Sequence, residues 1–216
     1  MTQRSYSGLF VAEGSSDAPL AELIESLFLQ RGVDVRLSQP DFSLLGRVAK
    51  DVGSRVSAGL RLAGEPADLI VVHRDADNAG HAARRQEIVT AVSSLKVPSA
   101  LIPVIPVRMT EAWLLLDEAA IRLVAGNPKG RMNLTLPKRH EVESLADPKN
   151  VLRTCLLTAS GETGRRGDAV RNRFNQHRRQ LLELLDPSGP VSTLQSWKRL
   201  LDEVDHIVAG WEPYRD

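Results

Sequence analysis

Asp68-Leu69-Ile70-Val71-Val72-His73 is the stretch of sequence that decides the fold. Its four central residues are aliphatic, and three of those four are β-branched. A continuous run of this kind is typical of a parallel strand that is buried on both faces. We therefore predict a central strand, which ends where the chain continues into Arg74-Asp75-Ala76-Asp77.

Strand-like and helix-like segments alternate on either side of this stretch. Short apolar runs at residues 8–12, 32–37 and 101–107 predict three further strands. In the last run, Pro103 and Pro106 favour a place at the edge of the sheet or an irregular exit from it. The segments between the runs have apolar residues at helical spacing. This alternation predicts an α/β fold with an open, mostly parallel, four-stranded sheet flanked by helices.

The second half of the chain has a different character. Helical patterns follow one another there, separated by breaks rich in proline, glycine and asparagine at residues 126–130, 147–149 and 186–190. We therefore predict two parts, an α/β core over residues 1–120 and a helical C-terminal region over residues 121–216 that packs on or beside the core.

Composition and charge exclude several classes of protein. Hydrophobic residues make up 42% of the 216 residues and charged residues 25%, which indicates a globular rather than a disordered chain. Because the formal net charge is only +1, any contact with nucleic acid depends on a local basic patch. The chain lacks a secretory pattern and any bilayer-spanning apolar run, so we expect a cytoplasmic protein without membrane contact. The single cysteine, Cys155, lies in an apolar run and is expected to be buried and inert.

Acidic side chains follow two of the predicted strands. Glu13 comes directly after residues 8–12, and Asp75 and Asp77 follow residues 68–73. In open parallel sheets ligands bind at the carboxyl ends of the strands, so both groups are expected at the same rim. Carboxylate oxygens are the ligands that Mg²⁺ and Mn²⁺ prefer. Alternatively, Asp75 and Asp77 form an Asx-turn and cap the next helix, whereas Glu13 has no such structural purpose.

Two further acids are candidates for the same rim. Asp17 lies four residues after Glu13, where a carboxylate in the first turn of a helix also complements the helix dipole. Glu111 lies just past the fourth predicted strand, and the same alternative applies to it. Asp117 points towards the opposite helix face from Glu111, and we expect it to be structural.

These motifs together resemble those of the Toprim fold, which is shared by type IA and type II topoisomerases, bacterial primases and nucleases of the overcoming-lysogenization-defect family. The family pattern is a glutamate that ends the first strand, often within Glu-Gly-x-x-Asp, and an Asp-x-Asp that ends the third. Glu13, Gly14 and Asp17 match the first motif. Asp75 and Asp77 match the second. The resemblance implies a metal-dependent site for phosphodiester chemistry.

Five acids are therefore candidate ligands of Mg²⁺ or Mn²⁺: Glu13, Asp17, Asp75, Asp77 and Glu111. They are enough to place two ions, which in such sites activate water and stabilise the charge on the leaving oxygen. We expect Glu13, Asp75 and Asp77 to be catalytic. The resemblance also implies an alternative role for Glu13 as general base or general acid.

A closer resemblance extends over about residues 8–205. Segments 106–117 and 145–149 look like those of a bacterial family of Toprim-related proteins with a domain of unknown function. Members of that family are discussed alongside ATPase partners and phage-defence nucleases. The resemblance therefore implies an ATPase partner and a place in a phage-defence module.

The segment of residues 165–179 is strongly basic, with six arginines against one acid. The six are Arg165, Arg166, Arg171, Arg173, Arg178 and Arg179. This density of positive charge predicts binding to a nucleic-acid backbone, with an affinity that falls as the salt concentration rises. The alternative is a solvated helix face, or a surface that pairs with an acidic partner.

Three functional hypotheses follow. The first is a Toprim-type nuclease that needs Mg²⁺ or Mn²⁺ and cuts DNA or RNA. The second is a non-catalytic subunit that binds nucleic acid or regulates an ATPase partner. The third, a phosphatase of the haloacid-dehalogenase kind, is disfavoured because Asp75-Ala76-Asp77 follows the third predicted strand and not the first, and lacks the Thr or Val expected after it.

Overall fold

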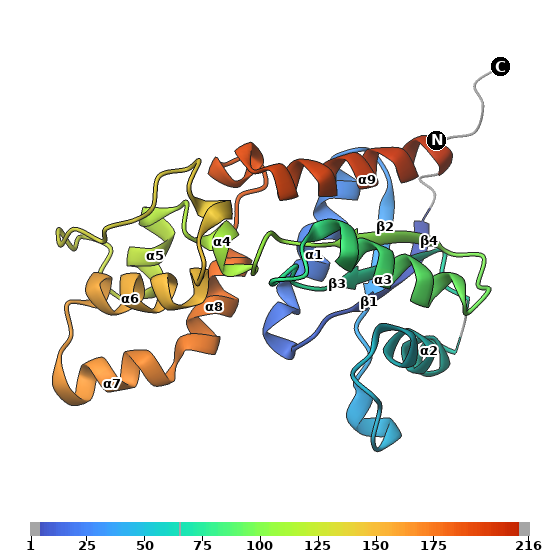
Figure 1. Cartoon of the computed structure of the whole chain (residues 1–216), viewed down its shortest axis with the longest axis horizontal. Helices are drawn as coiled ribbons and strands as arrows, with labels where there is room; N and C mark the ends of the chain where they lie inside the picture. The colour runs from blue at the N-terminus through green and yellow to red at the C-terminus, as the bar shows by residue number, and fades with distance from the viewer. Residues whose placement is uncertain (1–4, 65, 212–216) are drawn as a thin grey trace. The chain divides into compact units, whose positions relative to one another are not determined.

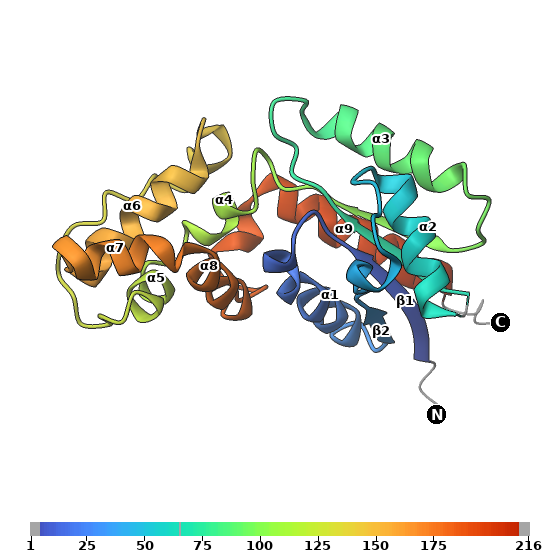
Figure 2. The same cartoon turned by 90° about the horizontal axis from the view of Figure 1, so that it is seen from below.

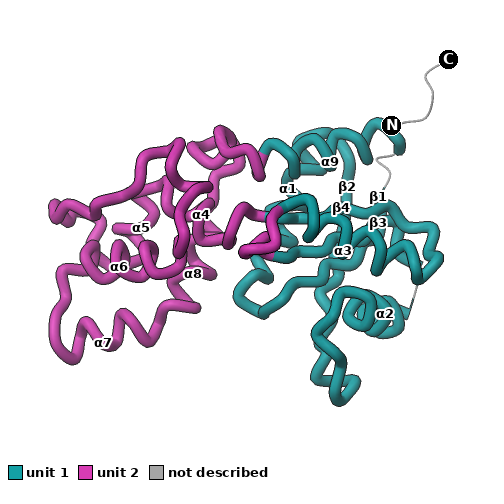
Figure 3. Tube along the Cα trace, in the orientation of Figure 1, with its two compact units in different colours: residues 1–74, 81–105, 198–216 teal, residues 75–80, 106–197 magenta. Residues whose placement is uncertain are grey.

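The computed structural model describes residues 5–64 and 66–211. The chain divides into two compact units, shown in Figure 3. The first unit comprises residues 1–74, 81–105 and 198–216, and the second comprises residues 75–80 and 106–197. This division differs from the predicted one, because the chain leaves the first unit directly after its fourth strand and its last helix belongs to the first unit again.

The first unit contains a four-stranded parallel sheet (Figure 1). Its strands are β1 (Ser5–Val11), β2 (Asp34–Ser38), β3 (Leu69–His73) and β4 (Ala100–Val104), in the order β2-β1-β3-β4. Every pairing between the described strands is parallel. The predicted α/β open sheet is therefore confirmed. All five residues of β3 are buried, as a central strand requires, and the proline-containing β4 lies at the edge.

Helices cover both faces of this sheet (Figure 2). They are α1 (Pro19–Leu29), α2 (Val52–Ala63) and α3 (His81–Ser93). Helix α1 lies on one face, and α2 and α3 pack together on the other. Asp51 precedes α2 and caps it, because its carboxylate accepts a hydrogen bond from Ser54 N. Gly64, which has a φ of 72°, follows the last residue of the helix.

Helix α9 (Gln195–Trp211) begins in the second unit, and its residues 198–211 belong to the first. In the first unit, the Trp211 ring stacks on Tyr6 and Phe28, with centroid separations of 4.0 and 5.7 Å. An ion pair between Arg85 and Glu203, 2.9 Å long, joins α9 to α3. The C-terminal helix is thus an integral part of the first unit.

The second unit is helical. Its helices are α4 (Glu111–Leu114), α5 (Glu118–Val124), α6 (Pro148–Ser160), α7 (Gly164–Asn172) and α8 (Phe174–Glu183). Short 3-10 turns η3 (Val142–Ser144) and η4 (Pro190–Thr193) join them. Two buried tryptophans form the centre of the core: Trp113 meets Trp197 edge to face at 5.1 Å, and Trp113 Nε1 donates to Ser196 Oγ.

Cys155 is buried, and burial followed by the nearby Glu118 charge raises the pKa of its thiol, which fits an inert side chain. Within residues 5–64 and 66–211, no helix has the length and apolar character that crossing a membrane requires.

Candidate functional site

The two acidic motifs follow the paired strands β1 and β3 at nearly the same number of residues past the last paired positions. Val11 of β1 is paired with Val72 of β3. Glu13 follows two residues after Val11, and Asp75 three residues after Val72. Among the five candidate acids, Glu13 and Asp17 belong to the first unit, whereas Asp75, Asp77 and Glu111 belong to the second.

Glu13 lies in the turn that leaves β1 and has a cationic neighbour. Its carboxylate forms an ion pair with Arg74, the residue that follows β3. Arg74 also pairs with Glu87 of α3, with 3.1 Å between Nη1 and Oε1. The Glu13 side chain is 41% exposed, so the carboxylate remains open to solvent while its charge is balanced. Sequence reasoning did not identify Arg74, because nothing in the pattern joins it to Glu13.

Asp17 ends the 3-10 turn η1 (Ser15–Asp17) and is buried, with only 5% of its surface exposed. Its Oδ2 lies 3.7 Å from Nδ1 of His73, the last residue of β3, which is also buried. The carboxylate therefore faces an imidazole inside the first unit. Asp17 also lies in the first turn of η1, so the helix-dipole alternative stays open.

Asp75 is oriented by a residue far along the chain. Its Oδ1 accepts hydrogen bonds from the Thr110 amide at 2.9 Å and from Thr110 Oγ1 at 3.0 Å. Thr110 is fully buried, directly before α4. Two donors on one oxygen hold the carboxylate in one orientation, as outer-shell partners do for metal ligands. Sequence reasoning missed Thr110, whose only signal is its position next to Glu111.

Asp77 has a backbone conformation that non-glycine residues rarely adopt. Its φ is 46°, and that of Arg108 is 62°. The two residues are joined, since Asp77 N donates to Arg108 O at 2.9 Å, and the Arg108 guanidinium donates to Asn78. Left-handed conformations at such residues carry strain and persist where the surroundings impose them, often at functional sites.

Glu111 and Arg178, predicted to bind a metal and a nucleic acid, form an ion pair in which Arg178 Nε lies 3.0 Å from Glu111 Oε1. Their predicted roles in binding stay predictions. Glu111 is 3% and Arg178 5% exposed, so Arg178 does not lie on the basic surface. The reason is that α4 packs against α8, which encloses both side chains.

The other five arginines of the basic segment are exposed on α7 and α8 or between them: Arg165, Arg166, Arg171, Arg173 and Arg179. Three of them have acidic neighbours on the same helix or just before it. Arg166 pairs with Glu162, Arg171 with Asp168, and Arg179 with Glu183. Exposed pairs of this kind are weak and leave the guanidinium accessible to a phosphate.

A hollow of about 420 Å³ adjoins Glu13 at the carboxyl ends of β1 and β2. Residues from the turn after β1, the loop after β2 and α2 line it, among them Ser15, Phe42 and Arg55. Arg55 Nη1 donates to the carbonyl oxygens of Ala12 and Glu13 and so fixes the exit of β1.

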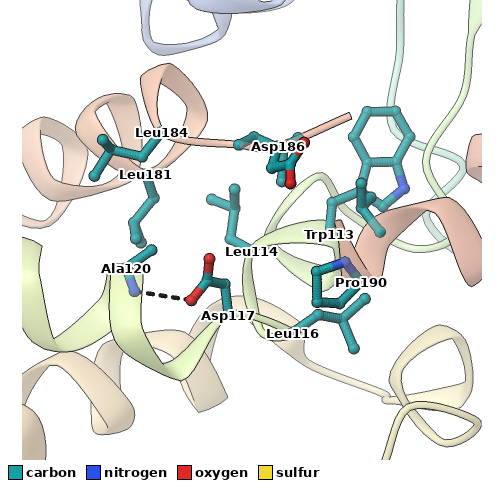
Figure 4. Close-up of a pocket in the computed structure, with 11 residues that line it drawn as sticks. Trp113, Leu114, Leu116, Asp117, Ala120, Leu181, Leu184, Asp186 and Pro190 are labelled. Atoms are coloured by element: carbon teal, nitrogen blue, oxygen red, sulfur yellow. Dashed lines mark hydrogen bonds between the residues drawn. The ribbon is translucent and has the colours of Figure 1, made fainter. Parts of the chain in front are cut away.

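The second unit contains a much smaller cavity, shown in Figure 4. It measures about 20 Å³, enough for about one water molecule, and Trp113, Leu114 and Leu181 are among its mostly apolar lining. Asp117 lies beside it and caps α5 by accepting a hydrogen bond from Ala120 N. The structural role predicted for Asp117 is thus confirmed.

In the part of the chain that the structure describes, no three His, Cys, Asp or Glu side chains form a group that could hold a metal ion. The metal site therefore stays a prediction. Comparisons of the chain with protein-family models, with curated proteins and with solved structures find no match.

Proposed function

We propose that this protein is a divalent-metal-dependent nuclease of Toprim type, which hydrolyses phosphodiester bonds in DNA or RNA. The observation that carries the proposal is the placement of acids after two adjacent parallel strands. Glu13 follows β1, and Asp75 and Asp77 follow β3, at the carboxyl ends where open α/β sheets bind their ligands.

The side chains in question have the chemistry that Mg²⁺ or Mn²⁺ requires, since all of them are carboxylates. Glu13, Asp75 and Asp77 would hold the ion, and Asp17 would support them from its buried position beside His73. When bound, the metal would lower the pKa of water and stabilise charge on the phosphate oxygens. Thr110 orients Asp75, and Arg74 balances the charge of Glu13.

Nucleic-acid binding is supported by the exposed arginines of α7 and α8. Five guanidinium groups on this short segment give it a local positive charge, although the net charge of the chain is only +1. Contacts of this kind are not specific to a base sequence, and they weaken steeply as salt rises. The protein would therefore bind the proposed substrate through the sugar-phosphate backbone of the nucleic acid.

A second candidate function is a non-catalytic Toprim-like subunit, which binds nucleic acid or regulates an ATPase partner in a phage-defence module. The observation that favours it is the set of exposed arginines on α7 and α8, which can bind a nucleic-acid backbone without a metal or a reaction. Under this second candidate the protein itself would cleave no nucleic acid.

The deciding experiment incubates purified protein with supercoiled DNA, linear DNA and RNA in Mg²⁺, Mn²⁺ or EDTA. Glu13→Gln, Asp75→Asn and Asp77→Asn are compared with Asp202→Asn, which changes an exposed acid of α9. We expect cleavage that needs metal, disappears in the three variants and persists in Asp202→Asn. Folded protein that binds nucleic acid but never cleaves it would reject the nuclease in favour of the second candidate.

A further inference from the structure

The hollow beside Glu13 has features that metal chemistry does not explain. We call it the β1–β2 groove, and it is defined by Glu13, Ser15, Asp41, Phe42 and Arg55 among its lining residues. Its volume of about 420 Å³ falls in the range of about 300–1,000 Å³ that is usual for sites of small organic groups. All of these residues belong to the first unit.

Two flat side chains lie together in this groove. The guanidinium carbon of Arg55 is 5.7 Å from the centre of the Phe42 ring, within the range of a cation–π contact. Hydrogen bonds from Arg55 Nη1 to the carbonyl oxygens of Ala12 and Glu13 fix the guanidinium. Phe42 is held in the 3-10 turn η2 (Phe42–Leu45), which Asp41 caps by accepting from Ser43 N. Fixed aromatic rings and guanidinium planes are the surfaces on which unpaired bases stack.

The charges of the groove favour a neutral occupant over a phosphate. Two carboxylates, Glu13 and Asp41, flank the single guanidinium of Arg55. Hydrogen bonds from the Ser43 hydroxyl and amide lower the pKa of Asp41, so this carboxylate is charged at neutral pH. Because Arg74 already balances the charge of Glu13, the groove offers a phosphate no excess of positive charge, whereas a flat, uncharged base needs none.

We propose that the β1–β2 groove binds one unstacked base of a single-stranded nucleic acid, which lies against Phe42 and Arg55. The inference rests on the proposed function, because it takes Glu13 as the site of reaction and names the substrate as a strand with an exposed base. A duplex keeps its bases paired and stacked, so presenting one to the groove costs unstacking energy. The protein therefore prefers single strands or frayed ends.

The test measures binding in EDTA, where cleavage does not interfere. Fluorescence anisotropy is recorded with a labelled single strand and with the same strand annealed to its complement. Salt is raised until the electrostatic grip of the exposed arginines is weak. We expect tighter binding of the single strand, and a loss of roughly 5- to 100-fold in Phe42→Ala, since stacking on one aromatic residue accounts for a factor of this size.

Matched variants separate stacking from general damage. Leu44→Ala changes an exposed residue of the same turn outside the groove, and Arg61→Gln removes an exposed cation from the same helix as Arg55. Both are expected to bind like the unchanged protein, whereas Arg55→Gln binds more weakly. If Phe42→Ala unfolds, Phe42→Leu keeps the bulk without the ring and Phe42→Trp keeps the ring, so only the latter should retain binding.

Three results would overturn the inference: equal binding of single strand and duplex, unchanged binding in folded Phe42→Leu, or competition by a nucleoside monophosphate as strong as by the strand. The last result would assign the groove to a free nucleotide. Failure of the nuclease is seen separately, because Asp75→Asn addresses cleavage without touching the groove. Strand binding that depends on Phe42 but is followed by no cleavage would reject the nuclease and support the groove.

Discussion

Glu111 and Arg178 form an ion pair that is almost completely buried, with side-chain exposures of 4% and 6%. The pair links α4 to α8 in the core of the second unit. The opposite charges of the two side chains compensate each other in this buried position. The behaviour of the pair on mutation therefore distinguishes a structural role from a catalytic one.

Removal of one partner should destabilise the protein strongly. In Arg178→Met, Glu111 is left as a buried, uncompensated charge, and we expect the free energy of unfolding to fall by about 3–5 kcal/mol. Urea denaturation followed by tryptophan fluorescence measures this, because Trp113 and Trp197 lie in the same core. The control is Arg179→Met, an exposed arginine whose loss should change stability by less than about 1 kcal/mol.

Removal of both partners should be far milder. Replacing the pair by apolar residues, as in Glu111→Leu with Arg178→Met, is expected to restore most of the lost stability. If cleavage is observed, this double variant should retain it. A folded double variant without activity would instead return Glu111 to the set of metal ligands.

Thr110→Val tests the orientation of Asp75. The change keeps the shape of the buried side chain and the amide donor but removes the hydroxyl that lies 3.0 Å from Asp75 Oδ1. We expect the Mg²⁺ concentration for half-maximal cleavage to rise about 10- to 100-fold, as is common when an outer-shell partner is lost. Thr90→Val, at an exposed threonine of α3, serves as the control. An unchanged metal requirement in Thr110→Val would show that the amide alone orients the carboxylate.

His177 should make the protein less stable in mild acid. Burial, followed by the positive charge of Arg173, lowers the pKa of this histidine below its ordinary value of 6.5. The unfolded chain then takes up a proton at a pH where the folded chain does not, so stability falls as the pH drops below about 6.5. In His177→Gln, the difference in urea midpoint between about pH 8 and about pH 5.5 should shrink. Burial, followed by the positive charges of Arg199 and Arg85, also lowers the pKa of His81. Any pH dependence of stability that remains in His177→Gln would then come from His81.

Cys155 should resist thiol reagents until the protein unfolds. Its side chain is 1% exposed, and Sγ donates a weak hydrogen bond to Leu134 O at 3.4 Å. Because burial raises the pKa of the thiol, little thiolate is present at about pH 8. Labelling with a chromogenic disulfide should be slow in buffer and fast in concentrated urea. Fast labelling of the folded protein would contradict the burial.

The sheet could be predicted from the sequence because its signals are local. Four short apolar runs indicated the strands. The unbroken aliphatic character of residues 69–72 indicated the central strand, and Pro103 favoured an edge strand. The candidate acids were proposed for the same reason, since a carboxylate directly after a buried strand is visible in the sequence. That they share one rim stays a prediction from the rule for parallel sheets.

The partners of those acids could not be predicted in this way. Glu111 meets Arg178 across 67 positions of the chain, and Asp75 meets Thr110 across 35. Such pairs are decided by helix packing and not by local pattern. The unit boundary was missed for a related reason. Helix α9 has an apolar face, formed by Leu200, Val204 and Ile207. The sequence does not show which unit this face covers.

The return of α9 to the first unit has a consequence for the order in which the protein is made. Residues 106–197 of the second unit lie between two parts of the first, so a ribosome releases them before residues 198–211 of α9, which include Trp211. Since domains fold as their residues appear, the helical unit can be complete while Tyr6 and Phe28 still lack the ring that stacks on them. A polypeptide that stops before residue 198 would therefore contain the whole helical unit and all four strands, but would lack the part of α9 that belongs to the first unit.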